Sequence, residues 1–322
     1  MSMRRIFQIL GIASFCVFIG IEAWSNRVLV TKAFDVKNLS WREFVQDIRM
    51  NFQQGFFGKV DWIDGNGLFM RALDRRVSNT VLRGKGDMLL YREWGRVDPL
   101  VRAKEICRWN RWQGAHGGKY LYVQTPAKLD RRLEILPAGC NPDDFDVYGP
   151  VDNLIAVLRT NNVPCMDLSW DLAMNAKQVQ CNYYRTDHHW TYEAAFSVFP
   201  DVARKIAELA GTTLPLDCPE LKSENWKRIT LPRSFLGSHG RRTGAGFAGY
   251  GDFTYLVPIF PTRMAMCMEN GDLANAGDFG EAIVSKRVLA SGPFHDAAGV
   301  RYGVYFGSER GAMHIRSALA PC

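Results

Sequence analysis

The chain begins with an apolar segment preceded by basic residues. Arg4 and Arg5 precede residues 6–21, which contain no charged side chain. This run approaches the roughly 20 residues that span a bilayer, and basic residues stay on the cytoplasmic side. The pattern predicts one helix in the cytoplasmic membrane with its N-terminus inside, within a region 1–25 that is an uncleaved anchor or a cleaved signal peptide. We expect residues 26–54 to form a juxtamembrane stalk and the main domain to be extracytoplasmic.

Apolar positions in the middle of the chain follow strand-like and helix-like patterns in turn. Residues 97–112 have helical spacing, and residues 120–126 form a short apolar run that ends at a proline. Before a second short apolar run at 163–168, one helix face is marked by Val151, Leu154, Ile155 and Leu158. A strand, a helix and a strand in this order predict a parallel crossover. Functional side chains then gather at the carboxyl ends of the strands.

Three further segments carry structural signals. Gly58–Phe69 mixes turn formers with large apolar residues, which predicts strands and tight loops. Thr191 can cap a helix that Pro200 kinks or divides, with an apolar face of Ala194, Val198, Val202, Ile206 and Leu209. The glycine-rich residues 237–251 are expected to form a loop that leads into a strand at 252–258. The fold class is therefore α/β, with a mainly parallel sheet flanked by helices.

The composition favours a folded protein. A chain of 322 residues with 47% hydrophobic content can bury a substantial core. The net charge of +7 suits an anionic partner such as a membrane surface or an acidic glycan, whereas no dense basic run indicates nucleic acid. The eight cysteines have no zinc-type spacing, so no structural zinc is expected. With Cys16 in the apolar segment an odd number remains, which leaves at least one thiol unpaired.

Asp187, His188 and His189 are the strongest candidates for chemistry. In a Ser-His-Asp site, the histidine accepts the nucleophile's proton and the aspartate holds the imidazole in the required tautomer. Because residues two apart can share one side of a turn, Asp187 and His189 form the natural pair and His188 points elsewhere. The same residues could instead be structural histidines or ligate a metal with a nearby carboxylate.

The surrounding residues strengthen the catalytic interpretation. Tyr184–Thr191 reads Tyr-Arg-Thr-Asp-His-His-Trp-Thr, which resembles the motif of the DHHW family and is similar to the Asp-Thr-His-Trp block of SGNH hydrolase-like proteins of the AlgX and AlgJ type. The resemblance extends to Gly58–Phe69, the strand 120–126 followed by Lys128, Asp167, Ser234–Arg242, Gly251–Thr254 and Tyr302–Ile315.

This resemblance implies an SGNH-like domain over residues 55–322, located outside the cytoplasmic membrane and acting without a cofactor on acetyl esters of cell-surface carbohydrate. Asp187 and His189 take the acid and base positions. Supporting roles fall to Arg185, His188, Trp190, Arg241 and Arg242.

The serine nucleophile is where the chain departs from the family. The family places it in a late Asp-Ser-Phe segment, and no Asp-Ser dipeptide occurs in this sequence. Ser238 and Ser308 are the glycine-flanked substitutes. We therefore expect a domain that is truncated at its C-terminus, lacks the nucleophile block and has little esterase or acetyltransferase activity.

Three hypotheses of function remain. The first is a membrane-anchored relative of carbohydrate O-acetyltransferases and acetylesterases, with a polysaccharide and a membrane-bound acetyl-donor protein as partners. The second is a non-catalytic glycan-binding or envelope-assembly component. The third is a secreted metal-binding protein that uses His188, His189 and a carboxylate.

Overall fold

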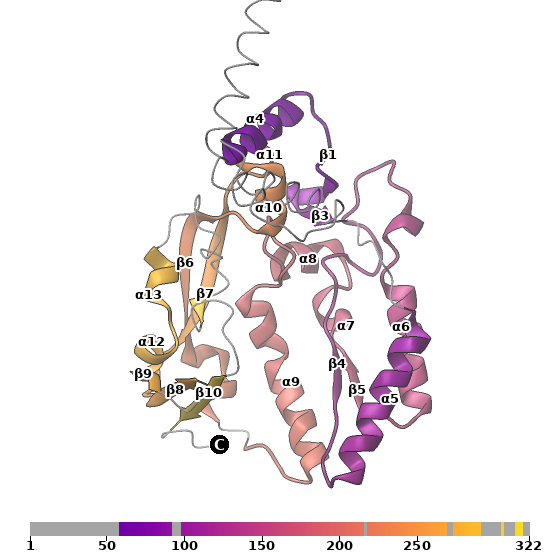
Figure 1. Ribbon diagram of the computed structural model, residues 1–322, viewed down its shortest axis with the longest axis vertical. Coiled ribbons are helices and arrows are strands. Elements are labelled where there is room, and N and C mark those ends of the chain that lie inside the picture. The colour runs from indigo at the N-terminus through magenta and orange to yellow at the C-terminus, as the bar shows by residue number, and fades with distance from the viewer. Residues whose placement is uncertain are drawn as a thin grey trace, which may run out of the picture. The chain divides into compact units, whose positions relative to one another are not determined.

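The computed structural model (Figure 1) describes the following stretches: residues 58–91, 98–215, 218–268, 273–290, 304–305 and 313–317. The chain divides into two units, Met1–Asn66 and Gly67–Cys322. The predicted membrane helix and stalk, residues 1–54, lie outside the described stretches. Within those stretches no helix has both the length and the apolar character needed to cross a bilayer.

Helices and short strands alternate along the described chain. The helices are α4 (Lys59–Ala72), α5 (Pro99–Ala115), α6 (Tyr148–Thr160), α7 (Ser169–Leu172), α8 (Ala176–Asn182), α9 (Tyr192–Ala210), α10 (Ser238–Thr243), α11 (Ala245–Ala248), α12 (Phe279–Ala282) and α13 (Lys286–Ala290), with 3-10 turns at Lys85–Asp87, Pro142–Phe145, Pro219–Leu221 and Ser223–Asn225. The strands are β1 (Val77–Ser78), β2 (Val81–Arg83), β3 (Leu89–Tyr91), β4 (Tyr122–Gln124), β5 (Cys165–Asp167), β6 (Trp226–Phe235), β7 (Gly251–Pro258), β8 (Met264–Met268), β9 (Leu273–Gly277) and β10 (Met313–Ser317).

The predicted crossover unit is present. β4 and β5 pair in parallel, with Tyr122 opposite Cys165 and Gln124 opposite Asp167, and α6 connects them. α5 and α6 pack against each other and against the end of this unit through Ala103, Ile106, Leu154, Leu158 and Val163. The helical and strand-like patterns of this region were therefore interpreted correctly, because each element buries one continuous apolar stripe.

The expectation of a mainly parallel sheet is wrong for the described strands. β1, β2 and β3 form an antiparallel sheet, as do β10, β8 and β9, and β6 pairs antiparallel with β7. Parallel neighbours need a long crossover connection, whereas antiparallel neighbours can be joined by a short one. Short connections join β1 to β2 and β2 to β3, which pair antiparallel, whereas α10 and α11 lie between the antiparallel strands β6 and β7.

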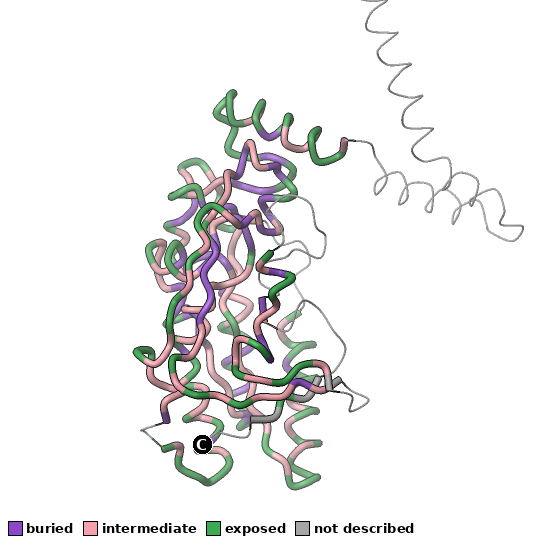
Figure 2. Tube along the Cα trace, turned by 90° about the vertical axis from the view of Figure 1, so that its left-hand side faces the viewer, coloured by how far each residue is buried: buried purple, intermediate pink, exposed green. Residues whose placement is uncertain are grey.

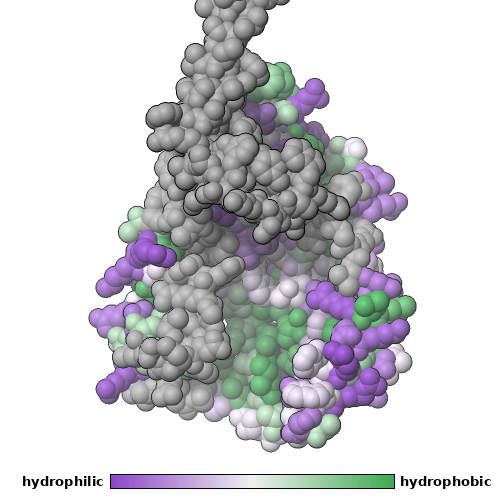
Figure 3. Space-filling view, in the orientation of Figure 1, coloured by the Kyte–Doolittle hydropathy of each residue, from purple (hydrophilic) through white to green (hydrophobic). Residues whose placement is uncertain are grey.

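Thr191 caps α9 as predicted. Its side chain accepts a hydrogen bond from the Ala194 N–H at 3.2 Å, and Pro200 lies inside a helix that continues to Ala210. Ala194 and Val198 are buried, but Ile206 is 55% exposed, so the predicted apolar face is only partly covered. Figure 3 shows an apolar area where α9 lies in Figure 1.

Two glycine-containing segments differ from expectation. Gly58–Phe69 lies mostly in α4 and contains no strand. Gly67 is buried there, and a Cβ atom at this position would overlap the Thr243 carbonyl oxygen. The glycine therefore permits close packing and does not mark a turn. Residues 237–251 likewise form α10 and α11 before β7, although Gly244 and Gly249 adopt the positive φ values typical of glycine at helix ends.

Several small apolar clusters form the interior of the unit that begins at Gly67, and Figure 2 shows the buried positions in purple.

A buried network of charged and polar side chains lies at the end of β5. The Arg131 guanidinium contacts the Asp167 carboxylate at 2.5 Å, bonds the Ser169 hydroxyl at 2.8 Å and lies over the Trp170 ring. Both charged side chains are nearly inaccessible to solvent, and they neutralise each other. Asp167 is therefore part of a structural ion pair.

Candidate functional site

The segment that carries Asp187 and His189 is a turn between two helices. It follows α8 and enters α9 through Thr191, whose backbone N–H donates to the Asn182 carbonyl at 2.8 Å. Tyr183 and Trp190 form an isolated antiparallel bridge inside this closure. The two ends of the turn are therefore tied together, which limits how far its side chains can move.

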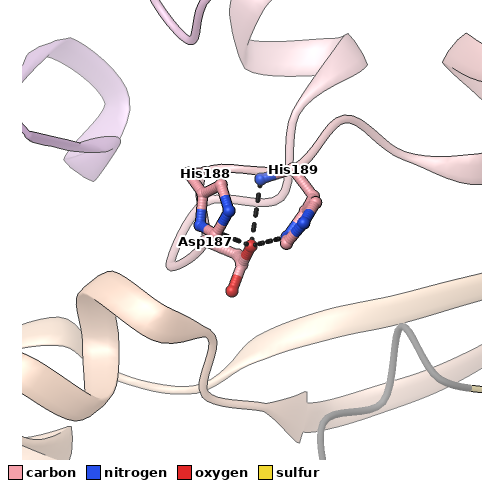
Figure 4. Close-up of side chains that lie close together, drawn as sticks. All are labelled: Asp187, His188 and His189. Atoms are coloured by element: carbon pink, nitrogen blue, oxygen red, sulfur yellow. Dashed lines mark hydrogen bonds and ion pairs between the residues drawn. The ribbon is translucent and has the colours of Figure 1, made fainter. Parts of the chain in front are cut away.

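Asp187 and His189 form a hydrogen-bonded pair (Figure 4). Asp187 is fully buried, and its Oδ1 accepts the His189 Nδ1–H at 2.5 Å and the His189 backbone N–H at 2.9 Å. Its Oδ2 accepts the Ser238 backbone N–H at 2.5 Å. Burial alone raises the pKa of the Asp187 carboxyl, but these hydrogen bonds outweigh it and hold the pKa below its ordinary value. The carboxylate thus orients the imidazole through Nδ1, and proton transfer to a reactant would pass through Nε2.

His188 turns toward a different partner. Its Nδ1 lies 2.7 Å from the Ser238 hydroxyl, compared with 3.4 Å from the Asp187 Oδ1. The His188 side chain is 54% exposed, and partial burial together with nearby positive charges lowers its pKa despite the Asp187 carboxylate. The structure therefore pairs Asp187 with His189, as the two-residue spacing predicted, and His188 contacts Ser238, which the sequence did not predict.

The turn docks closely on the start of α10. The Gly237 N–H donates to the Thr186 hydroxyl at 3.0 Å, and the Gly240 N–H donates to the Thr186 carbonyl at 2.9 Å. A Cβ atom on Gly237 would overlap the Asp187 side chain. Only glycine therefore lets the Ser238 N–H reach the carboxylate, and α10 and the turn form one rigid arrangement.

Lys128 holds the turn from the opposite side. This residue follows β4, is 8% exposed and donates to the carbonyls of Tyr184, Arg185 and Asp187 at 2.7, 2.8 and 2.6 Å. Burial lowers the pKa of the Lys128 amine, while the Asp187 carboxylate opposes that shift. Three carbonyl acceptors use three N–H donors, which only the ammonium form offers. We therefore assign a positive charge to Lys128 and a positioning role at the pair.

A cavity of about 560 Å³ opens beside the pair. Its wall comes from the loop after β4, the Asp187–His189 turn, α10 and the end of β3: Tyr91, Thr125, Pro126, Ala127, Lys128, Leu129, Tyr183, His188, His189, Trp190, Ser238, His239 and Arg242. A volume of this size accommodates a small organic ligand or a sugar unit. Because both histidines of the motif line it, the cavity is the natural place for a reacting group.

The other predicted supporting residues divide into two groups. His188, Trp190 and Arg242 line the cavity. Arg185 instead donates to the Ala248 carbonyl, and Arg241 is exposed on α10 outside the cavity wall. Arg185 therefore supports the contact with α11. The candidate nucleophile Ser308 lies outside the described residues, and Ser238 lies in the cavity wall with its hydroxyl on His188.

The geometry favours a hydrogen-bonded pair over a metal centre. Ligand atoms of Asp187, His188 and His189 lie within 4.8 Å of one another. Two ligands about 2.1 Å from one tetrahedral zinc ion stand roughly 3.4 Å apart, whereas the Asp187 Oδ1 and His189 Nδ1 are 2.5 Å apart. The observed separation is that of two atoms joined directly by a hydrogen bond.

His239 and Tyr91 line the cavity but were not identified from the sequence as site residues. His239 lies within the segment Ser234–Arg242 that carried the family resemblance, and its single imidazole next to a glycine-flanked serine was an available signal. Tyr91 ends β3, almost a hundred residues before the motif, and no local pattern connects the two. Its position depends on the docking of β3 against the turn, where the Leu89 N–H donates to the Arg185 carbonyl at 2.9 Å.

Three solved structures show weak similarity to the chain. PatB1 of Bacillus cereus matches with a TM-score of 0.49 and 15% identity, covering 68% of this chain and 71% of that one. A DHHW family protein from Eubacterium siraeum matches with a TM-score of 0.47 and 16% identity, covering 76% and 73%. The O-acetyltransferase domain of Pseudomonas putida AlgJ matches with a TM-score of 0.37 and 18% identity, covering 56% and 66%.

The comparison with protein families is more direct. A search of curated proteins gave no match. Residues 92–227, which include Asp187 and His189, match the family described as SGNH hydrolase-like domain, acetyltransferase AlgX. The predicted resemblance to SGNH hydrolase-like proteins of the AlgX type is therefore confirmed over this part of the chain.

Proposed function

We propose that this chain is an extracytoplasmic SGNH-like protein of carbohydrate O-acetyl chemistry, in which Asp187 and His189 are the acid–base pair. The observation that supports this most is the buried Asp187 carboxylate on Nδ1 of His189, at the edge of a cavity large enough for a sugar unit. Such a pair can accept a proton from a hydroxyl nucleophile and return it to a leaving group. The matched family and the AlgJ domain are both described as acetyltransferases, which supports an acetyl ester as the reacting group.

We further propose that the described residues contain the acid–base half of the site without its serine. No Asp-Ser dipeptide occurs in the sequence. The Ser238 hydroxyl bonds Nδ1 of His188, and its backbone N–H bonds Asp187. The hydroxyl and the backbone N–H of Ser238 thus both hold the Asp187–His189 turn in place. An acetyl-donor protein in the membrane is a proposed partner of this site.

Hydrolysis of acetyl esters tests this assignment. We expect the full chain, His189→Ala and Ser238→Ala to hydrolyse 4-nitrophenyl acetate and an acetylated oligosaccharide at slow rates that agree within about threefold, because a general base without its nucleophile adds little. Ser308→Ala tests the second candidate serine, which lies outside the described residues. Fast turnover that is lost in both His189→Ala and one serine variant would instead identify that serine as the nucleophile.

A glycan-binding function is the second candidate. Tyr91, Tyr183 and Trp190 contribute aromatic rings to the cavity wall, and such rings pack on the apolar faces of sugars. Two results together would favour this function over the enzymatic one. The chain would bind the acetylated oligosaccharide, and the ester would be hydrolysed no faster than in buffer.

The proposed location outside the cytoplasm rests on the N-terminal sequence. Arg4, Arg5 and the uncharged residues 6–21 are typical of a membrane anchor with its N-terminus inside. We expect protease added to intact spheroplasts to degrade the part of the protein that follows residue 25. Degradation only after lysis would place the domain in the cytoplasm and contradict the proposed topology.

A further inference from the structure

The helix α5 carries apolar side chains on two opposite sides. One side is the buried stripe that includes Ala103 and Ile106, and it packs against α6 on the outer side of the β4–β5 pair (Figure 1). The other side faces solvent. Trp109 and Trp112 are each 49% exposed there, and Val101 is exposed three helical turns before Trp112. We call Val101, Trp109 and Trp112 the tryptophan face of α5. Large apolar side chains that stay exposed on an already packed helix indicate a surface that meets a partner.

Basic side chains border the tryptophan face. The exposed basic residues of α5 are Arg102, Lys104, Arg108 and Arg111, whereas Glu105 is the one acidic residue of this helix. Glu105 pairs with Arg108 at 3.0 Å, and in the described part of the chain no other carboxylate forms an ion pair with a basic residue of α5. Lys104 and Arg111 are two turns apart and therefore lie on one flank of the helix. Their positive charges are available to an anionic partner that meets the indoles.

The arrangement of the rings favours a lipid surface over a polysaccharide. Trp109 and Trp112 meet edge to face, with 5.8 Å between ring centres and 81° between planes. His116 lies against Trp112 with 4.5 Å between ring centres, and its Nδ1–H donates to the Trp112 carbonyl at 2.8 Å. A polysaccharide stacks best on successive ring faces that are turned the same way, and these two indoles are nearly perpendicular. Indoles among lipid headgroups need no common plane, because each one buries its apolar body and leaves its N–H in the hydrated layer.

We propose that the tryptophan face of α5 docks on the headgroups of an anionic membrane. The indoles of Trp109 and Trp112 enter the headgroup layer, while Lys104 and Arg111 pair with lipid phosphates. α5 then lies flat on the surface, as is usual for a helix with an apolar stripe and basic flanks. The N-terminal anchor proposed above would hold the chain at a bilayer, and α5 adds a second contact. None of these residues lines the cavity, so this inference does not depend on the proposed acetyl chemistry.

Fluorine NMR on the full chain in lipid nanodiscs measures this docking. The tryptophans are replaced by 5-fluorotryptophan, and the variants Trp109→Phe and Trp112→Phe assign the two signals. A neutral, soluble gadolinium chelate broadens the signals of rings that face water. We expect nanodiscs that contain anionic phosphatidylglycerol to protect both rings and nanodiscs of phosphatidylcholine alone to leave them accessible, because the attraction depends on the lipid charge. Trp170 of α7 is 53% exposed and should stay accessible in both lipids, which makes it the internal control.

Charge variants test the flank of the helix. Lys104→Gln combined with Arg111→Gln should weaken docking about 30-fold, which corresponds to about 1 kcal/mol for each basic residue near an anionic surface. The matched control, Lys177→Gln combined with Arg204→Gln, removes one exposed lysine from α8 and one exposed arginine from α9 and should leave the protection unchanged.

Three results would overturn the proposal. The first is equal accessibility of the two indoles in both lipids, which would exclude docking driven by lipid charge. The second is an equal loss of protection in the two double variants, which would show a diffuse effect of net charge. The third is protection by soluble polygalacturonate as strong as that by phosphatidylglycerol, which would assign the tryptophan face to acidic polymers in general.

Discussion

Replacing Asp187 by asparagine should lower the free energy of unfolding at pH 7 by about 2–4 kcal/mol. The carboxylate accepts three hydrogen bonds, two on Oδ1 from His189 and one on Oδ2 from the Ser238 N–H. An asparagine has one oxygen and one NH₂ group at these positions. In either orientation of the amide a backbone N–H faces the NH₂ group and loses its acceptor inside a fully buried site.

The effect of this substitution should depend on pH in a defined direction. The folded state holds the pKa of Asp187 below its ordinary value, so the carboxylate contributes its full stability above the unfolded pKa of roughly 3.9. That contribution is lost as the pH falls through the lower, folded pKa. The difference between the wild-type chain and Asp187→Asn should therefore be constant between about pH 5 and 7 and should shrink below about pH 4.

Urea unfolding followed by tryptophan fluorescence at pH 7, 5 and 3 measures this dependence. Asp201→Asn is the control, because the ion pair of Asp201 with Arg204 is exposed and its loss should cost less than about 1 kcal/mol at any of these pH values. A difference that stays constant down to pH 3 would mean that folding does not shift the pKa of Asp187. The hydrogen bonds from His189 and Ser238 would then not stabilise the ionised form of Asp187.

Replacing Arg131 by methionine should cost about 3–5 kcal/mol, because it leaves the Asp167 carboxylate buried without its cation. Asp167 is 4% exposed and would keep only the Ser169 N–H, at 3.0 Å. The guanidinium also bonds Asp152 at 2.9 and 3.0 Å and packs between the rings of Tyr148 and Trp170. Thermal unfolding by circular dichroism measures the loss.

Two further variants test the reason for the Arg131 effect. Arg132→Met removes the neighbouring arginine, whose ion pair with Glu134 is exposed, and should change stability by less than about 1 kcal/mol. The double variant Arg131→Met with Asp167→Asn should be more stable than Arg131→Met alone, since it removes the unpaired charge. A double variant no more stable than Arg131→Met would show that packing, and not charge, explains the loss.

Local patterns predicted the elements that bury one continuous stripe. The β4–α6–β5 unit and the capped helix α9 appeared in the sequence as runs of apolar residues, with clear ends at Pro126 and Thr191. The pairing of Asp187 with His189 was predictable for a similar reason. Both residues lie in one short turn, where a separation of two positions already determines which side chains can meet.

Glycines misled the sequence interpretation where their purpose was packing between distant segments. The sequence predicted a turn at Gly67, but this residue lies in α4. The position is a glycine because a larger side chain would overlap Thr243. Gly237 was placed in a loop, whereas it marks the start of α10 and lets Ser238 reach Asp187. A glycine can be required for its backbone freedom or for its small size. The sequence does not distinguish the two, because the reason depends on which distant segment packs against it.

By itself, the sequence determined the parallel crossover, the pairing of Asp187 with His189 and the resemblance to AlgX-type SGNH proteins, since each shows in motifs and short runs along the chain. Only the tertiary structure decided that Lys128 holds the turn, that Ser238 bonds His188, and that Tyr91, His239 and Arg242 form one wall of the cavity. These contacts join segments 50 or more residues apart. Their formation depends on how whole elements pack, which no local periodicity records.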